Sequence, residues 1–182
     1  MISKYEEILN TYFVPLFLKR YGSIEAFEAD EAFEDRQRTA TLLAKMLAEA
    51  PRTAGHVFEI DDFPLTIEAF EILDAHLTPA IARIWMETSD PEDPNNFFKL
   101  NVSEFATHLG TVLMNSLGGR WRFSRSPNYF MSGVVVGSLE FAIFDSVIKK
   151  SSSDFGHESL YQKYVTFANL VHTAEHGSKT PQ

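Results

Sequence analysis

The sequence of 182 residues contains no cysteine. This absence excludes a disulfide framework, a thiolate metal site and a cysteine nucleophile. Its uninterrupted apolar runs are all shorter than the roughly 20 residues that a membrane-spanning helix needs. The first residues, Met1-Ile2-Ser3-Lys4-Tyr5, do not start a basic segment followed by a long apolar one, as a secretory signal would. The sequence therefore predicts a cytoplasmic protein with no membrane partner.

The motifs of several common enzyme classes are also missing. No Gly-x-Ser-x-Gly marks a serine nucleophile, and neither the phosphate-binding loop Gly-x-x-x-x-Gly-Lys-Ser/Thr nor the dinucleotide pattern Gly-x-Gly-x-x-Gly is present. We therefore expect no cofactor and no catalytic residue, and favour a binding protein over an enzyme.

Basic residues are few and unevenly placed. Lysine and arginine number 16 against 25 aspartates and glutamates, for a formal charge of −9. Residues 1–100 hold 19 acidic and 9 basic side chains, which gives −10, whereas residues 101–182 hold 6 and 7, which gives +1. An acidic region repels nucleic acid and attracts a basic protein, so we expect a protein partner. The alternative is that these charges only keep the protein in solution. The pattern leaves self-association open.

What the sequence has in abundance is phenylalanine. Sixteen are spread along the chain, and 45% of residues are hydrophobic, which favours one aromatic-rich core. The length suits a single domain. We expect residues 1–182 to form that domain, with an acidic helical subregion at 1–100, a helix–meander–helix subregion at 101–176 and a frayed tail at 177–182.

Apolar residues at helical spacing predict most of the secondary structure. Helices are expected at residues 2–19, 24–50 (as one helix or two), 65–87, 101–117, 144–150 and 158–175. Pro15 should kink or shorten the first of these, and Thr78-Pro79 should kink the third or start a fresh helix. Asn101, with Glu104 three residues on, fits an N-terminal cap.

Two stretches have a different composition. Residues 51–64 contain proline, glycine and two aspartates, which predicts a loop with a short edge strand at residues 57–60. After Gly118-Gly119, which should end a helix, residues 120–124 alternate so that Trp121 and Phe123 share one face. Two further strands are expected at residues 129–136 and 139–141. The whole is thus an α+β fold, mostly helical, with a three-stranded antiparallel meander between helices.

The segment from Asn101 to Val171 resembles a loose group of uncharacterised bacterial cytoplasmic proteins. The resemblance rests on Gly118-Gly119-Arg120-Trp121, Val134-Val135-Val136, Phe144 with Val147 and Lys149, and Ser159-Leu160-Tyr161. Where this group would have an apolar residue and proline before the short helix, the chain has Ala142-Ile143-Phe144. The resemblance implies a small accessory protein, in some cases an immunity-type partner of a toxin, and implies no known chemistry.

Two places are candidates for binding. Arg120, Trp121 and Arg122 interleave cations with an aromatic ring, as in sheets that stack single-stranded nucleic acid. The alternative buries Trp121 beneath the helices and turns the arginines outward. Asp61 and Asp62 could bind a cation or a basic partner, although they lack the regular ligand spacing of a calcium loop and are equally explained as solvated charges.

The histidines suggest two further arrangements. His172-Thr173-Ala174-Glu175-His176 places two histidines on one helix face, in the order of an inverted zinc-protease motif, but too little chain follows for a third ligand. Interaction with the helix dipole explains His172 and His176 more simply. Glu104 and His108 are four residues apart and could form a hydrolase site, or an ordinary contact on a helix surface.

Overall fold

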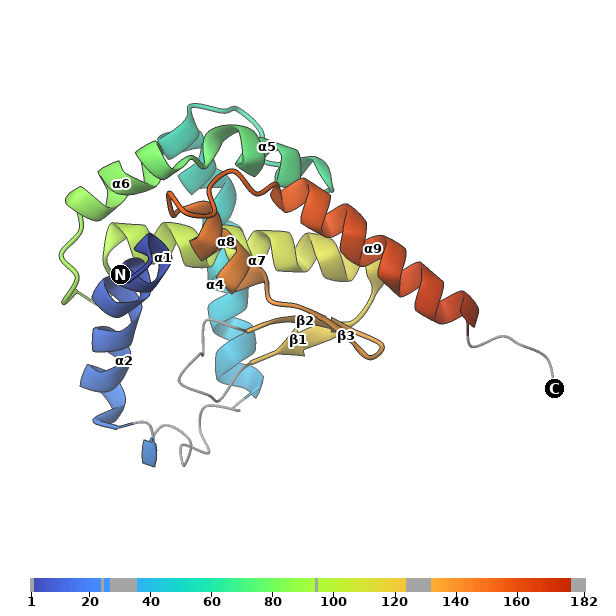
Figure 1. Cartoon of the computed structure of the whole chain (residues 1–182), viewed down its shortest axis with the longest axis horizontal. Helices are drawn as coiled ribbons and strands as arrows, with labels where there is room; N and C mark the ends of the chain where they lie inside the picture. The colour runs from blue at the N-terminus through green and yellow to red at the C-terminus, as the bar shows by residue number, and fades with distance from the viewer. Residues whose placement is uncertain (1, 24, 27–35, 94, 124–131, 178–182) are drawn as a thin grey trace.

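Figure 1 shows the chain as a computed structural model, in which residues 2–23, 25–26, 36–93, 95–123 and 132–177 are described. The helix α7 (Phe97–Leu117) crosses the middle, and other helices lie around it together with a small sheet. Buried side chains from both ends of the sequence join in one hydrophobic core. The α+β, mostly helical fold is thereby confirmed. Over the described residues, no helix combines the length and apolar character needed to cross a bilayer.

The first helical segment is irregular in its middle. It consists of α1 (Lys4–Ile8), the π-helical turn η1 (Leu9–Phe13) and α2 (Val14–Tyr21). Ser3 and Glu6 form a capping box at its start. At the π turn the N–H of Val14 bonds to the carbonyl of Leu9, five residues back. Pro15, which has no N–H, follows directly, so the predicted disturbance at this proline takes the form of a widened turn.

The helix α4 (Arg36–Phe58) corrects two predictions. It runs through Pro51, so residues 51–58 are not a loop, and residues 57–60 do not form a strand. Ala50, Ala54 and Phe58 recur every four residues and are buried, and α4 packs against α7. Burial of this stripe outweighs the roughly 3 kcal/mol that a proline inside a helix costs. The part of the predicted helix at 27–35 lies outside the described residues.

The next two helices are α5 (Glu68–His76) and α6 (Pro79–Glu87). Thr78 caps α6 by accepting a hydrogen bond from the N–H of Ile81, and Pro79 occupies the start of the helix. The predicted fresh helix start at Pro79 is confirmed, because a proline there loses no helical hydrogen bond.

The start of α7 differs from its prediction. Asn96 caps the helix, with its side-chain oxygen 2.8 Å from the N–H of Lys99. Asn101, predicted as the cap, lies buried one turn inside the helix. Both asparagines have cap chemistry, but a helix beginning at Phe97 also buries Phe98 in the core. At the other end Gly118, at φ 75°, stops the helix as expected.

The three strands form the predicted antiparallel meander in the order β1-β2-β3. They are β1 (Arg120–Arg122), β2 (Gly133–Val136) and β3 (Leu139–Phe141), and the register sets Trp121 opposite Val134 and Val134 opposite Phe141. These three side chains belong to the face that packs on the core. Residues 129–131 of the second predicted strand lie outside the described residues.

Two helices close the fold. The predicted short helix is present as α8 (Ile143–Lys150), and the last one as α9 (Leu160–Gly177). Ser159 caps α9, since its hydroxyl accepts a hydrogen bond of 2.9 Å from the N–H of Gln162. In Figure 1 α9 extends from the body of the molecule toward the C-terminus. The predicted tail lies, apart from Gly177, outside the described residues.

Candidate protein-binding surface

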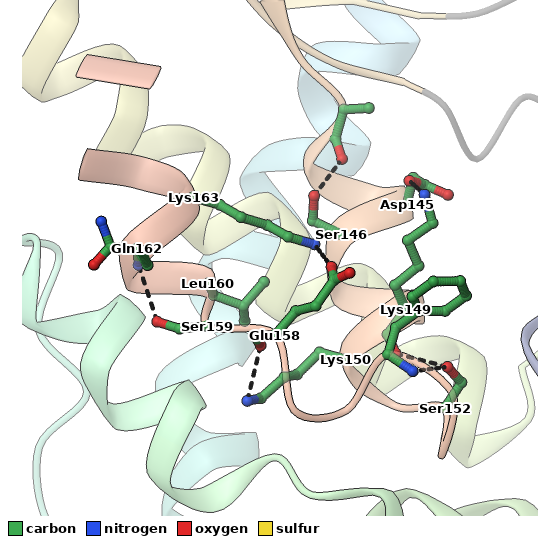
Figure 2. A network of polar contacts seen from close by, with 12 residues as sticks. Asp145, Ser146, Lys149, Lys150, Ser152, Glu158, Ser159, Leu160, Gln162 and Lys163 are labelled. Atoms are coloured by element: carbon green, nitrogen blue, oxygen red, sulfur yellow. Dashed lines mark hydrogen bonds and ion pairs between the residues drawn. The ribbon is translucent and has the colours of Figure 1, made fainter. Parts of the chain in front are cut away.

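Four cations of the C-terminal half, Arg122, Lys149, Lys150 and Lys163, form ion pairs within the molecule. Figure 2 shows this for α8 and the start of α9, where Lys149 lies 2.8 Å from Asp145 and Lys163 lies 2.5 Å from Glu158. The network joins the two helices and satisfies its own charges, as a structural joint does. These lysines therefore contribute little positive charge that a partner could contact.

The neighbouring Lys150 is paired in a more buried setting. Its side chain is 8% exposed, and its ammonium lies 3.2 Å from Asp74 of α5 and 3.1 Å from the carbonyl oxygen of Glu158. Asp74 also accepts hydrogen bonds from the backbone N–H groups of Leu160 and Tyr161, so a carboxylate on α5 helps to cap α9. The Asp74 carboxylate thus interacts with both Lys150 of α8 and the first backbone N–H groups of α9.

The predicted binding cluster Arg120-Trp121-Arg122 divides between two faces of the sheet. Trp121 is half-buried against α7 and stacks on Phe123 at 6.1 Å between ring centroids. Arg122 points outward and forms an ion pair of 2.5 Å with Glu140. The arrangement matches the alternative with Trp121 toward the core and the arginines outward. Arg120 is exposed, and a binding role for this cluster stays a prediction.

The connection between α4 and α5 has the opposite character. The connection and the first turn of α5 carry five exposed carboxylates, which together with Leu65 we define as the acidic surface: Glu59, Asp61, Asp62, Glu68 and Glu71. The sequence has no lysine or arginine between Arg52 and Arg83. Among the described residues none of the five carboxylates forms an ion pair. Sequence analysis singled out Asp61 and Asp62, whereas Glu68 and Glu71 were overlooked because they belong to a helix.

Leu65 lies between these carboxylates in the sequence and is 41% exposed. An apolar side chain surrounded by charges is the arrangement found at protein interfaces, where a central anchor is buried and a polar rim remains hydrated. In Figure 1 the connection and α5 form the upper edge of the molecule, away from the sheet. The acidic surface is thus accessible in the isolated chain.

His108 of α7 fixes this connection from below. Its Nε2 lies 2.8 Å from the carbonyl oxygen of Pro64, and its ring stacks on Phe63 at 4.2 Å between centroids. The imidazole is 2% exposed, and burial lowers its pKa because the charged form loses hydration. The acidic residues before and after Phe63 are consequently attached to the rigid core.

The predicted pair of Glu104 and His108 takes another form. Both side chains are buried, so an ordinary surface contact was the wrong expectation, and each bonds to a residue of a different segment. Glu104 accepts a hydrogen bond from the hydroxyl of Thr53 on α4, while His108 contacts Pro64. Burial raises the pKa of Glu104. Every residue of α7 from Asn101 to Gly110 is buried, so both residues lie inside the protein.

The histidines of the last helix show no ligand geometry within the described part of the chain. His172 is exposed on α9, and the side chain of His176 lies outside what the structure describes. The described residues contain no group of three or more histidines, aspartates or glutamates arranged to hold a metal ion. Asp61 and Asp62 likewise belong to no such group.

Comparison with known proteins adds no relative to these observations. No family model, no curated protein and no solved structure matches this chain. The resemblance around Gly118-Gly119-Arg120-Trp121 therefore stays a prediction, and the argument for a function rests on the surface chemistry of the chain itself.

Proposed function

We propose that this protein is a non-catalytic binding protein whose acidic surface docks a basic protein, of the kind represented by a nuclease or another toxin. Proteins that act on nucleic acid need cationic surfaces, because they neutralise phosphates. An inhibitor of such a protein needs carboxylates in an accessible and firmly held arrangement. The acidic surface of this protein would offer a basic partner carboxylates that are both accessible and firmly held.

The carrying observation is the difference between the two sets of charges. Lys149, Lys150 and Lys163 form ion pairs within the molecule, whereas the exposed carboxylates of the acidic surface form no ion pair with any cation that the structure describes. Unpaired charges of one sign produce a long-range field that accelerates encounter with an oppositely charged protein. Leu65 would supply an apolar anchor at the centre of the contact.

The test compares two charge-reversed variants. Asp61→Lys/Asp62→Lys alters the acidic surface, and Glu87→Lys/Glu92→Lys alters exposed carboxylates near the end of α6 instead. Both change the net charge by the same amount. Proteins of the source cell are captured on each variant at low salt, and the captured basic protein is then purified for binding measurements. Cytochrome c, a basic protein, serves as the comparator for charge alone.

We expect the wild-type chain and the α6 variant to retain the same basic protein, and the Asp61/Asp62 variant to lose it. The affinity of the wild-type chain for the captured protein should fall as salt is raised. It should exceed the affinity of the wild-type chain for cytochrome c by at least about tenfold, because a specific interface adds apolar contacts to charge. Equal loss in both variants, or equal binding of cytochrome c, would contradict a specific acidic docking surface.

A further inference from the structure

A cleft separate from the acidic surface lies between the N-terminal helix and α6. Its volume is about 550 Å³, within the range of small-molecule sites. One wall comes from α1 and η1, the opposite wall from α6, and the segment after α8 closes it at Ser151, Ser152 and Ser153. In Figure 1 α1 and α6 both lie at the left of the molecule.

The interior of this cleft is mainly apolar. Ile8 is buried, and Tyr12 and Met86 are half-buried beside it. The hydroxyl of Tyr12 donates a hydrogen bond of 2.9 Å to the carbonyl oxygen of Met86. This bond joins the two walls and directs the polar end of the tyrosine into the protein. A ligand entering the cleft would therefore meet hydrocarbon and an aromatic ring.

The rim carries a cation whose donors are open. Arg83 is 71% exposed, and its nearest carboxylate, on Glu87, is 3.8 Å away, too far for a hydrogen bond. Its guanidinium has no hydrogen-bond partner among the described residues. Lys4, also on the rim, is instead bonded to Glu7 at 2.6 Å. The charged lining residues thus sum to one positive charge, although the whole chain carries −9.

The wall facing Arg83 has a second unusual property. Thr11 and Tyr12 belong to the π-helical turn η1, and both line the cleft. A π turn is less favourable than a regular α-helical turn, and such turns occur often at functional sites. Here the turn brings the hydroxyl of Thr11 and the ring of Tyr12 to the same side of the cavity.

From this combination we propose that the cleft binds a small organic carboxylate with an apolar body. The carboxylate would accept paired hydrogen bonds from Arg83, whose planar fork fits two oxygen atoms. The apolar body would cover Ile8, Tyr12 and Met86, and the hydroxyls of Thr11 and Ser153 would border the entrance. The site is independent of the proposed protein partner.

Octanoate is a suitable probe, because it joins one carboxylate to a short hydrocarbon chain. Octan-1-ol and octylamine have the same chain length with a neutral and a positive end. Titration calorimetry and melting temperature are measured for the full-length protein with each compound. We expect octanoate to bind and to raise the melting temperature, since a ligand of the folded state stabilises it. Octylamine should not bind.

Two variants locate the site. Arg83→Gln should weaken octanoate binding by about tenfold or more, the usual effect of losing hydrogen bonds to a charged group. Ala80→Phe places a ring at the exposed rim and should block entry. Arg52→Gln is the matched control, because Arg52 is likewise exposed and paired with a helical glutamate, and it should leave binding unchanged.

Three results would overturn the proposal. Octan-1-ol binding as tightly as octanoate would remove the role of the carboxylate. Unchanged octanoate affinity in Ala80→Phe would place the ligand elsewhere. An equal effect of Arg52→Gln and Arg83→Gln would reduce the interaction to general charge. Because Arg83 and Ala80 are exposed, circular dichroism should show both variants folded, which separates lost binding from lost structure.

Discussion

The ammonium of Lys150 on α8 and the carboxylate of Asp74 on α5 lie 3.2 Å apart, with both side chains largely shielded from water. The two residues are far apart in the sequence. Their contact joins α5 to α8, and the hydrogen bonds that Asp74 accepts from the N–H groups of Leu160 and Tyr161 add α9 to the same junction. Three helices thus depend on one carboxylate.

Removing that carboxylate should destabilise the protein severely. Asp74→Ala leaves Lys150 as a buried charge without its carboxylate partner and removes three hydrogen bonds at the start of α9, from Ser159, Leu160 and Tyr161. We expect a loss of about 3–5 kcal/mol in the free energy of unfolding. Urea denaturation followed by circular dichroism measures it. Asp74→Asn/Lys150→Met, which removes both charges, should recover part of the loss, and a double variant no better than Asp74→Ala would contradict this account.

The contact between Gly110 and Trp121 gives a second prediction. A Cβ at position 110 would lie 2.1 Å from Cη2 of Trp121, so the indole must move in Gly110→Ala. Overpacking of this kind costs about 1–3 kcal/mol. The emission of Trp121 should shift to longer wavelength as the ring becomes more exposed. The double variant Gly110→Ala/Trp121→Ala should lose less stability than the two single variants added together, because without the indole there is no clash.

His108 should make stability depend on pH. Burial holds its folded-state pKa below the unfolded value of about 6.5. Between the two pKa values the unfolded chain binds more protons, so stability is full above pH 6.5 and is lost as pH falls toward the folded-state pKa. Urea denaturation at pH 7.5 and at pH 5 measures the difference. His108→Gln, whose amide can donate to the Pro64 carbonyl, should reduce it; an identical difference in both proteins would count against His108.

Glu104 should act in the opposite direction. Burial raises its pKa, so the folded protein retains a proton that the unfolded chain releases, and stability falls as pH rises from 4.5 through the folded-state pKa. At pH 7 the ionised carboxylate remains a cost. Glu104→Gln keeps an oxygen for the Thr53 hydroxyl and should melt at a higher temperature than wild type at pH 7. The difference should disappear below pH 4, and a difference independent of pH would disprove the titration argument.

Glu59 links the stability of the chain to its proposed function. It has φ 57° just after α4, a left-handed conformation that costs a residue with a side chain about 1–2 kcal/mol. Glu59→Gly should therefore raise the free energy of unfolding, by up to about 1 kcal/mol after the entropy of glycine is allowed for. Affinity for the captured basic protein should fall. Glu59→Ala is the control, because it removes the same carboxylate without relieving the strain.

Local chemistry explains the parts of the fold that could be predicted. Gly118 stops a helix because glycine tolerates positive φ, and alternation around Trp121 is sufficient to identify a strand. The helical course of residues 51–58 could not be read in the same way. Pro51 and Gly55 favour a loop locally, and only packing of Ala50, Ala54 and Phe58 on α7 reverses that preference.

Of the two candidate sites, the acidic surface could be predicted from the sequence and the cleft could not. Asp61 and Asp62 were predictable because a loop exposes its charges, and the lack of lysine or arginine between residues 52 and 83 could have added Glu68 and Glu71. The cleft beside Arg83 could not be predicted. Its walls come from segments separated by about 70 residues each, and only the folded chain brings them together.

The burial of α7 between Asn101 and Gly110 also means that this part of the helix cannot accept an insertion or a deletion. Every residue from Asn101 to Gly110 is buried, so each direction around the helix axis is already occupied. Inserting one residue there would rotate everything beyond it by about 100°. Gly110 would turn away from Trp121, and Leu113 would leave the core. The length of this helix therefore cannot change without loss of the core packing.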